Sequence, residues 1–418
     1  MKGRICVVKT LIYQMYPSSW GSLRDMAKHL HRLECLSVDY VWLSPCFQSP
    51  WDDGGYDVSD YLQIDPRFGT LEDFDFFVAE AKRHHIGVLM DLVMNHTSTR
   101  HEWFQRSRAC DPQYRDYYIW RDEDLGWKNN FNGESAFLWD EKRRQYYLHL
   151  FCDTQADLNW QNPAVLEEFQ KIIDFWTLEH GVAGFRLDVA QYLSKDLTKS
   201  QIPGCFGVAR GFLKYWQKPE TVEILHRLFD GRDLFVFSES GFISKRQFRE
   251  MAGPSGPLSA ALNVVTYNGP AGNSFGLFRA LTHHWSHEPG FIACAESHDA
   301  PRSTSRYHRP GEEVARELFR PSTSIACLYQ GQELGLTNPI LPDTIDGYQD
   351  IQTIMRYDRM VNRGISPRKA ISKLRDGSRD NARRPIDLEQ YRFQELDLDS
   401  CLTTVKRLIK KWRAAAPH

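Results

Sequence analysis

The sequence has 418 residues, 42% of them hydrophobic, and a formal net charge of −2 at pH 7. This length permits a large core, and the near-neutral charge excludes a basic surface for nucleic acid or an anionic membrane. The first residues, MKGRICVVKTLIYQMYP, hold too short an apolar stretch for a signal peptide or a spanning helix. Nine dispersed cysteines without a C-x-x-C pair indicate reduced thiols. We expect a cytoplasmic protein with no cofactor and no bound metal.

Short apolar runs recur along the chain, and each is followed at some distance by a helical pattern. They cover residues 11–17, 38–45, 86–93, 181–188, 234–239, 260–267, 290–299 and 324–332. Near-continuous apolar strands that alternate with helices are typical of a parallel sheet. Eight such units predict an α/β fold of the (β/α)8, or TIM barrel, type.

The connection after the third strand is long, poorly periodic and rich in Trp, Tyr, Asn and Asp. A connection of this length is usually functional. We therefore predict a barrel built from residues 1–95 and 161–418, with a small inserted domain over residues 96–160.

The helix before the fourth strand has clear start and stop signals. Asn162 suits its N-cap, and Pro163 suits its first turn. Gly181 suits a left-handed end directly before the next strand. This tight connection is typical of a barrel.

The fourth strand, within GFRLDVA, carries two opposite charges. Arg186 and Asp188 are two residues apart, so on a strand they face the same side. If that side is the barrel interior, both lie at the C-terminal mouth, where barrel enzymes keep their active sites. The arginine then pairs with Asp188 and favours its ionised form. A structural buried ion pair explains this one pattern equally well.

Other strand ends carry acidic and polar groups too. They are Glu239 in LFVFSES, His298 and Asp299 in AESHDAPR, Asp91, Asn95 and His96 in DLVMNHT, and Tyr56 and Asp57 in GGYDVSDY. Like charges gathered at one rim repel, so stability alone does not explain the clustering. A substrate that needs an acid, a base and an anionic nucleophile does explain it.

The chemistry that this pattern favours is retaining glycoside cleavage. One carboxylate attacks the anomeric carbon, and a second, about 5–5.5 Å away, protonates the leaving oxygen. Phe235 and Phe237 before Glu239 favour the raised pKa that an acid needs. The spacing of Asp91, Asn95 and His96 also resembles a metal site, the main competing chemistry. We interpret Asp91 and Asn95 as bracing their loop.

These motifs, in their order and spacing, resemble glycoside hydrolase family 13, the α-amylase family. Within it the chain is similar to the oligo-1,6-glucosidase, α-glucosidase and sucrose isomerase group. The resemblance covers about residues 11–413 and also includes the motifs IDPRFGTLEDFD, QYYLHLF, QADLNW, YQGQELG and SRDNARRP.

The resemblance implies roles for four residues in the cleavage step. Asp188 is the expected nucleophile and Glu239 the expected general acid/base. Asp299 is the expected third carboxylate, which holds sugar hydroxyls, and Arg186 is expected to orient Asp188.

The resemblance also implies how a sugar is held. His96 and His298 are expected to bind hydroxyls, and Tyr56 to stack on the sugar face. Asp57 and Arg383 are expected to close the pocket behind the non-reducing sugar, which favours exo-acting cleavage.

Three features depart from the family pattern. The loop YPSSWGSLRDM has only Asp25, so we predict no calcium there. The last residues resemble the final barrel helix, so we expect no C-terminal β-sandwich domain. The apolar surface that such a domain normally covers leads us to expect a homodimer. Single positions also differ, as in ESHD and SES.

Three functions follow from these observations. The first is a retaining exo-acting α-glucosidase that hydrolyses a small oligosaccharide or α-glucoside, with α-1,6 or sucrose-like bonds as candidates. The alternative is a transglucosidase or sucrose isomerase that uses the same residues. The third is a non-catalytic sugar-binding barrel, which retention of Asp188, Glu239 and Asp299 disfavours.

Overall fold

The computed structural model describes residues 9–198, 211–242, 244–268, 274–386 and 398–415. Parallel strands close a barrel in which each strand pairs with the next one along the chain and the last returns to the first. The eight predicted strands and the (β/α)8 fold are confirmed. In chain order the barrel strands are β1 (Thr10–Met15), β2 (Tyr40–Leu43), β5 (Gly87–Val93), β11 (Gly184–Asp188), β12 (Phe235–Ser240), β13 (Ala260–Asn263), β14 (Phe291–Cys294) and β15 (Ile325–Tyr329).

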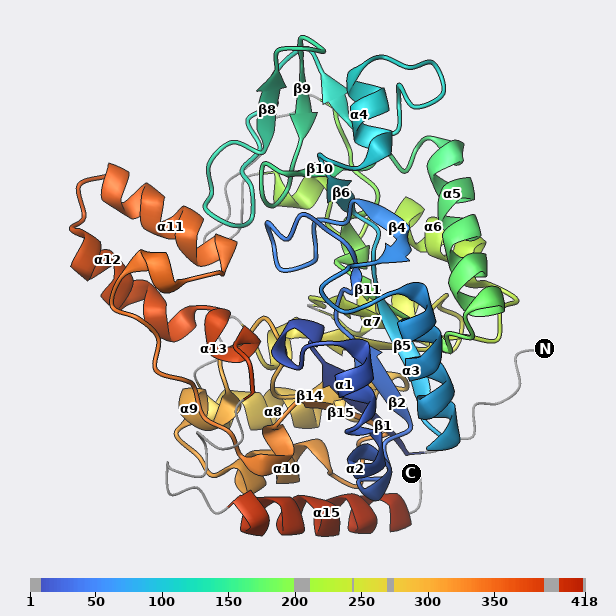
Figure 1. Ribbon diagram of the computed structural model, residues 1–418, viewed down its shortest axis with the longest axis vertical. Helices are drawn as coiled ribbons and strands as arrows, with labels where there is room; N and C mark the ends of the chain where they lie inside the picture. The colour runs from blue at the N-terminus through green and yellow to red at the C-terminus, as the bar shows by residue number, and fades with distance from the viewer. Residues whose placement is uncertain (1–8, 199–210, 243, 269–273, 387–397, 416–418) are drawn as a thin grey trace.

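Helices surround the barrel, and a further pair lies beside the inserted segment (Figure 1). That pair is α11 (Ile351–Asn362) and α12 (Pro367–Leu374). None of the helices in the described ranges is long and apolar enough to cross a membrane. The other helices are α1 (Leu23–Ala27), α2 (Leu30–Cys35), α3 (Leu71–Arg83), α4 (Glu102–Arg108), α5 (Pro163–Asp174), α6 (Pro219–Phe229), α7 (Lys245–Ala252), α8 (Phe275–Trp285), α9 (Ser303–Tyr307), α10 (Gly311–Leu318), α13 (Asp380–Arg383) and α15 (Leu398–Ala414).

The helix α5 begins as its sequence predicts, and the helical turn that continues it ends just before Gly181. The Asn162 side chain accepts a hydrogen bond from the Ala164 amide, and Pro163 occupies the first turn. Gly181 has a φ of 67°, in the left-handed region. Between them, Phe175–Glu179 form a π-helical turn that the periodicity did not predict.

The segment after β5 builds small sheets of its own. Strands β6 (His96–Ser98) and β10 (Gln155–Asp157) pair antiparallel. Strands β7 (Trp120–Arg121), β9 (Gln145–Leu148) and β8 (Phe137–Asp140) form a second sheet. Figure 1 shows β8, β9 and α4 together at one end of the molecule. All of these elements lie within residues 96–160, and the boundaries of an inserted domain stay a prediction.

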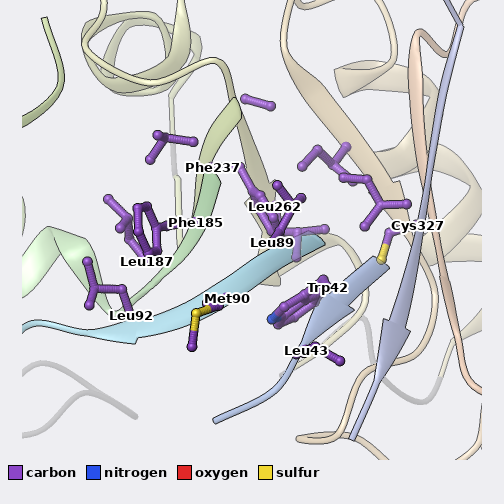
Figure 2. Packing of buried hydrophobic residues seen from close by; sticks show 14 of the residues in the cluster. Trp42, Leu43, Leu89, Met90, Leu92, Phe185, Leu187, Phe237, Leu262 and Cys327 are labelled. Carbon is purple, nitrogen blue, oxygen red and sulfur yellow. The ribbon is translucent and has the colours of Figure 1, made fainter. Parts of the chain in front are cut away.

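The barrel interior combines apolar packing with charge. Figure 2 shows Trp42, Leu89, Phe237 and Leu262 from four strands packed together. The Trp42 ring meets Phe237 edge-on, with centroids 5.4 Å apart. The Arg186 guanidinium lies 5.2 Å from the centroid of the Trp42 ring. A cation–π contact and apolar packing therefore support the charged side chains at the strand ends.

One barrel position tolerates only glycine. A Cβ atom on Gly184 would lie 1.9 Å from the Phe235 carbonyl oxygen of the paired strand. We expect Gly184→Ala to lower the free energy of unfolding by about 3 kcal/mol or more, because β11 and β12 must separate. Urea unfolding measures this loss.

The matched control is Gly276→Ala on helix α8. A Cβ atom there meets nothing within 4 Å. The exchange is expected to leave stability unchanged or to raise it by about 0.5 kcal/mol. Equal stability of the two variants would contradict the close strand approach at Gly184.

Candidate active site

Arg186 lies at the centre of a charged cluster at the strand ends. Its Nη1 atom donates to Asp91 Oδ1 at 2.7 Å and to Asp188 Oδ1 at 2.8 Å. Its Nη2 atom forms an ion pair with Glu239. The barrel register pairs Arg186 with Asp91 on one side and with Phe237 on the other. One buried guanidinium therefore brings together carboxylates from three neighbouring strands.

The carboxylates of this cluster are hard to ionise because they are buried. Burial raises the pKa of Asp188 to about 6, although Arg186 opposes the shift. Burial also raises the pKa of Asp91 to about 7, again against Arg186. For Glu239 burial outweighs Arg186 as well, and its pKa is raised. Burial therefore disfavours the charged form of all three carboxylates, while Arg186 favours it.

These shifts predict the acid side of the pH profile. Asp188, the nucleophile that the family resemblance predicts, would have to be ionised to attack, and burial raises its pKa to about 6. We therefore expect kcat/KM to fall as the pH drops below about 6, because the Asp188 carboxylate is then protonated. Rates on an aryl α-glucoside between pH 4.5 and 8 test this. A profile that stays flat down to pH 4.5 would contradict it, provided that activity returns at pH 7.

Asp299 lies among positive and neutral donors. Its Oδ1 atom accepts from Arg383 Nη2 at 2.6 Å and is 3.5 Å from Arg379 Nη1. Its Oδ2 atom is 3.2 Å from His298 Nε2. Burial alone would raise the pKa of Asp299, but His298 and both arginines hold it well below its usual range. Its side chain is 28% exposed, against 11% for Asp188, so it is open to a ligand.

Tyr56 and His298 form a stacked pair beside the cluster. Their ring centroids are 5.2 Å apart with an interplanar angle of 10°. The Tyr56 hydroxyl donates to Asp91 Oδ2 at 2.9 Å, and His298 Nε2 lies 2.5 Å from the same hydroxyl. Burial lowers the pKa of His298 well below its usual value, so the ring is neutral. Both predicted sugar-binding side chains therefore lie next to the carboxylates.

His96 lies on the inserted-segment side of the cluster. Its Nε2 atom is 3.1 Å from the Tyr56 carbonyl oxygen, and burial lowers its pKa. Its neighbour Asn95 donates to Asp157 at 2.9 Å and accepts from Lys195 at 2.7 Å. These hydrogen bonds of Asn95 hold the loop in place, which agrees with the interpretation of Asn95 from the sequence.

The interpretation of Asp91 needs correction. Its carboxylate accepts from Arg186, from Tyr56 and, at 3.2 Å, from the Trp42 indole. It belongs to the charged cluster and does not brace the loop.

The prediction that Asp57 helps Arg383 to close the sugar pocket also needs correction. Asp57 is completely buried and accepts from the Asp52 and Asp53 amides at 2.8 and 3.0 Å. It shapes its own loop. From this loop it is Asp53 that contacts the arginines: its Oδ1 accepts from Arg379 Nη2 at 2.8 Å and lies 3.9 Å from Arg383 Nη1.

A family model described as the α-amylase catalytic domain matches residues 13–230. The chain belongs to the α-amylase family. It is 36% identical over 414 residues to a trehalose-6-phosphate hydrolase of Escherichia coli, covering 90% of this chain and 74% of that protein. It is 34% identical over 427 residues to an oligo-1,6-glucosidase of Parageobacillus thermoglucosidasius, covering 92% and 75%.

Solved structures agree with this family assignment. The trehalose-6-phosphate hydrolase of Bacillus licheniformis aligns over 97% of this chain and 83% of its own, with 30% identity and a TM-score of 0.83. The isomaltulose synthase of Erwinia rhapontici NX5 aligns over 97% and 83%, with 26% identity and a TM-score of 0.84. The protein is therefore an enzyme of the α-amylase family that acts on α-glucosidic bonds, as an α-glucosidase or a transglucosidase.

Three residues beside the predicted catalytic carboxylates were not singled out from the sequence. Asp53 lies just outside the motif GGYDVSDY, and Arg379 lies inside SRDNARRP, where only Arg383 was given a role. Tyr267 donates to Glu239 Oε1 at 2.6 Å, and no motif pointed to it.

The competing metal interpretation finds no support in how its residues are placed. Asp91 faces Arg186, while His96 faces the Tyr56 carbonyl, so their ligand atoms serve different partners. In the described ranges, one His/Glu group with metal-like spacing exists, His31, Glu34 and His84, from α2 and the end of α3. It is separate from the charged cluster.

Asp25 is the one acidic residue of the loop for which we predict no calcium. Its carboxylate accepts from Ser22 and Lys28, both at 2.6 Å.

Proposed function

We propose that the protein is a retaining, exo-acting α-glucosidase that takes one glucosyl unit from the non-reducing end of a small α-glucoside. The observation that carries the proposal is the gathering of Asp188 and Glu239 on one guanidinium, with Asp299 held beside them by His298. This arrangement matches what a double-displacement cleavage needs: a nucleophile, an acid/base and a group that holds hydroxyls.

In the first step the Asp188 carboxylate attacks the anomeric carbon while Glu239 gives its proton to the leaving oxygen. The bond to the leaving sugar breaks, and a covalent glucosyl-enzyme forms. In the second step Glu239, now ionised, takes a proton from water, and that water displaces Asp188. Arg186 stabilises Asp188 whenever it is an anion.

The wall opposite the leaving group supports exo action. Arg383 donates to Asp299 and lies 5.7 Å from the Tyr16 ring centroid and 5.9 Å from that of Tyr56. A Cβ atom on Gly54 would come within 2.7 Å of Arg383 Nη1. These contacts of Arg383 support a closed end behind the first sugar, which exo action needs.

The alternative is a transglucosidase or isomerase with the same residues. It differs only in the acceptor, because a sugar hydroxyl then replaces water in the second step. The isomaltulose synthase reported above carries the name of such an enzyme. The substrate panel below therefore distinguishes the two functions.

The test is a substrate panel with identified products. We expect free glucose, released first as the α-anomer, from at least one of maltose, isomaltose, sucrose, trehalose and trehalose 6-phosphate, as well as from an aryl α-glucoside. A β-anomer as first product would contradict the double displacement, and internal cleavage of longer glucans would contradict exo action. A new disaccharide would favour the transglucosidase.

Two further proposals come from the sequence alone. We propose that the chain forms a homodimer and that it acts in the cytoplasm. Analytical ultracentrifugation at micromolar concentration tests the first, and a single monomeric species would contradict it. Fractionation of the source cells tests the second.

A further inference from the structure

A hollow lies between the inserted segment and helix α11. It has a volume of about 930 Å³, enough for a sugar ring with a substituent. Arg356 Nε on α11 donates to the Phe131 carbonyl oxygen at 2.9 Å, which ties the helix to the loop of the inserted segment. The residues that line the cavity are Asn129, Asn130, Phe131, Asn132, Gly133, Phe212, Trp216, Val264, Arg356, Arg359, Met360, Arg363, Ile365 and Leu374.

Residues that line this cavity contact neighbours of the charged cluster. The Arg379 guanidinium, which pairs with Asp53, lies 5.1 Å from the Phe131 ring centroid. On the other side, a Cβ atom on Gly241 would touch Trp216 at 2.8 Å and Val264 at 3.4 Å. Gly241 comes two residues after Glu239, the proposed donor of the leaving-group proton. The cavity is therefore placed to hold the leaving group.

The lining of the cavity is rich in hydrogen-bond donors and carries positive charge. It includes three arginines and no aspartate or glutamate. Arg359 and Arg363 share one carboxylate, that of Glu134, at 2.9 and 3.3 Å. For Arg356, no ion pair within 4 Å is found in the described part of the chain, and the carboxylate whose charge acts on it, that of Asp350, does so from farther away.

Two neutral donors in the same walls lack partners as well. Among the described residues, neither Asn130 Nδ2 nor Trp216 Nε1 has a hydrogen-bond partner, although both atoms are buried. Unsatisfied buried donors are costly and rare, and they call for an acceptor-rich ligand. A neutral sugar supplies hydroxyl oxygens as acceptors, but it carries no negative charge to pair with Arg356.

We propose that this cavity binds the leaving sugar and that Arg356 binds a phosphate ester on it. Arginine presents a planar fork of donors that matches phosphate oxygens. The proposal deepens the proposed function and rests on it, since the leaving group is defined by the position of Glu239. The substrate class is then an α-glucoside whose leaving sugar is phosphorylated.

The experiment compares glucose 6-phosphate with glucose as inhibitors of p-nitrophenyl α-glucoside hydrolysis. We expect glucose 6-phosphate to inhibit at a concentration lower by about tenfold or more, the effect of one hydrogen-bonded charge pair. In Arg356→Gln this ratio is expected to fall to about one. Arg356→Lys, which keeps the charge but loses the fork, is expected to keep part of it.

Arg363→Gln is the matched control, because Arg363 lies on the same helix and lines the same cavity but is paired with Glu134. Its inhibition ratio is expected to stay at the wild-type value. A wild-type ratio near one, or an equal loss in both glutamine variants, would overturn the proposal.

A failure of the proposed function shows separately, as absence of hydrolysis by the wild-type enzyme. In that case calorimetric titration with glucose 6-phosphate and with glucose decides the anion site. Equal affinity for the two, in wild type and in Arg356→Gln, would overturn it.

Discussion

Replacing Asp188 with Asn is expected to lower kcat by at least about 10⁴-fold, because the amide cannot attack the anomeric carbon. The side chain keeps its size and can still contact Arg186. The measurement is single-turnover and steady-state hydrolysis of an aryl α-glucoside by the purified variant.

The same variant separates a catalytic role from a structural ion pair. Arg186 already contacts Asp91 and Glu239, so negative charge is in excess around it. We therefore expect Asp188→Asn to have an unchanged or raised Tm, since the exchange relieves repulsion between buried carboxylates. A structural ion pair would instead lose about 3 kcal/mol or more of stability when one partner is removed. Wild-type rates with a lowered Tm would therefore remove Asp188 from the nucleophile role.

Chemical rescue adds an independent readout. In Asp188→Ala, azide can occupy the space of the carboxylate and attack the α-glucoside once, which gives β-glucosyl azide. The product anomer reports which carboxylate was replaced, because each displacement inverts the anomeric carbon. Formation of α-glucosyl azide by this variant would contradict the assignment.

The strand ends could be predicted because their signal is local. A strand alternates its faces, so Arg186 and Asp188 had to share one side, and both occupy the charged cluster. The eight apolar runs fixed the number of strands for the same reason. Parallel strands that close a barrel bring all carboxyl ends to one rim, so distant acidic residues were expected to meet.

The role of Asp91 depends on information that the sequence does not carry. Asp91 lies opposite Arg186 because β5 and β11 pair in one particular register. A shift of one residue would turn the Asp91 side chain away from the barrel interior. Without that register, loop bracing was the simpler interpretation.

The direction of the loop explains why Asp53, and not Asp57, contacts Arg379. These residues are separated by a turn in which Gly54 and Gly55 have φ angles of 58° and 99°. Glycines in the left-handed region reverse the chain. The reversal buries the Asp57 carboxylate against the backbone amides of Asp52 and Asp53 and points the Asp53 carboxylate at Arg379.

Tyr267 illustrates a third limit. It follows the short 3-10 turn Val264–Thr266, where neither the strand period nor the helix period applies. Only the folded chain shows that its hydroxyl reaches Glu239.

Replacing Glu239 with Gln is expected to separate substrates by their leaving groups. Sugar leaving groups need a proton, so their cleavage should slow by about 10³-fold, within the range for general acid catalysis. A dinitrophenyl leaving group departs without protonation, so its first step should slow far less. Comparison of isomaltose or sucrose with dinitrophenyl α-glucoside gives the measurement. Equal losses on both would contradict the acid role.

The pH profile of the wild-type enzyme also tests the role of Glu239 as the acid. Because burial raises the pKa of Glu239, the wild-type enzyme keeps its acid form toward neutral pH and loses kcat/KM as the pH rises through that pKa. This basic limb should disappear in Glu239→Gln. Tyr267→Phe is the control, since the Tyr267 hydroxyl hydrogen-bonds to Glu239 and lowers its pKa. Its basic limb should move to higher pH while sensitivity to the leaving group stays. A limb that shifts downward, or that persists in Glu239→Gln, would assign the proton donor to another group.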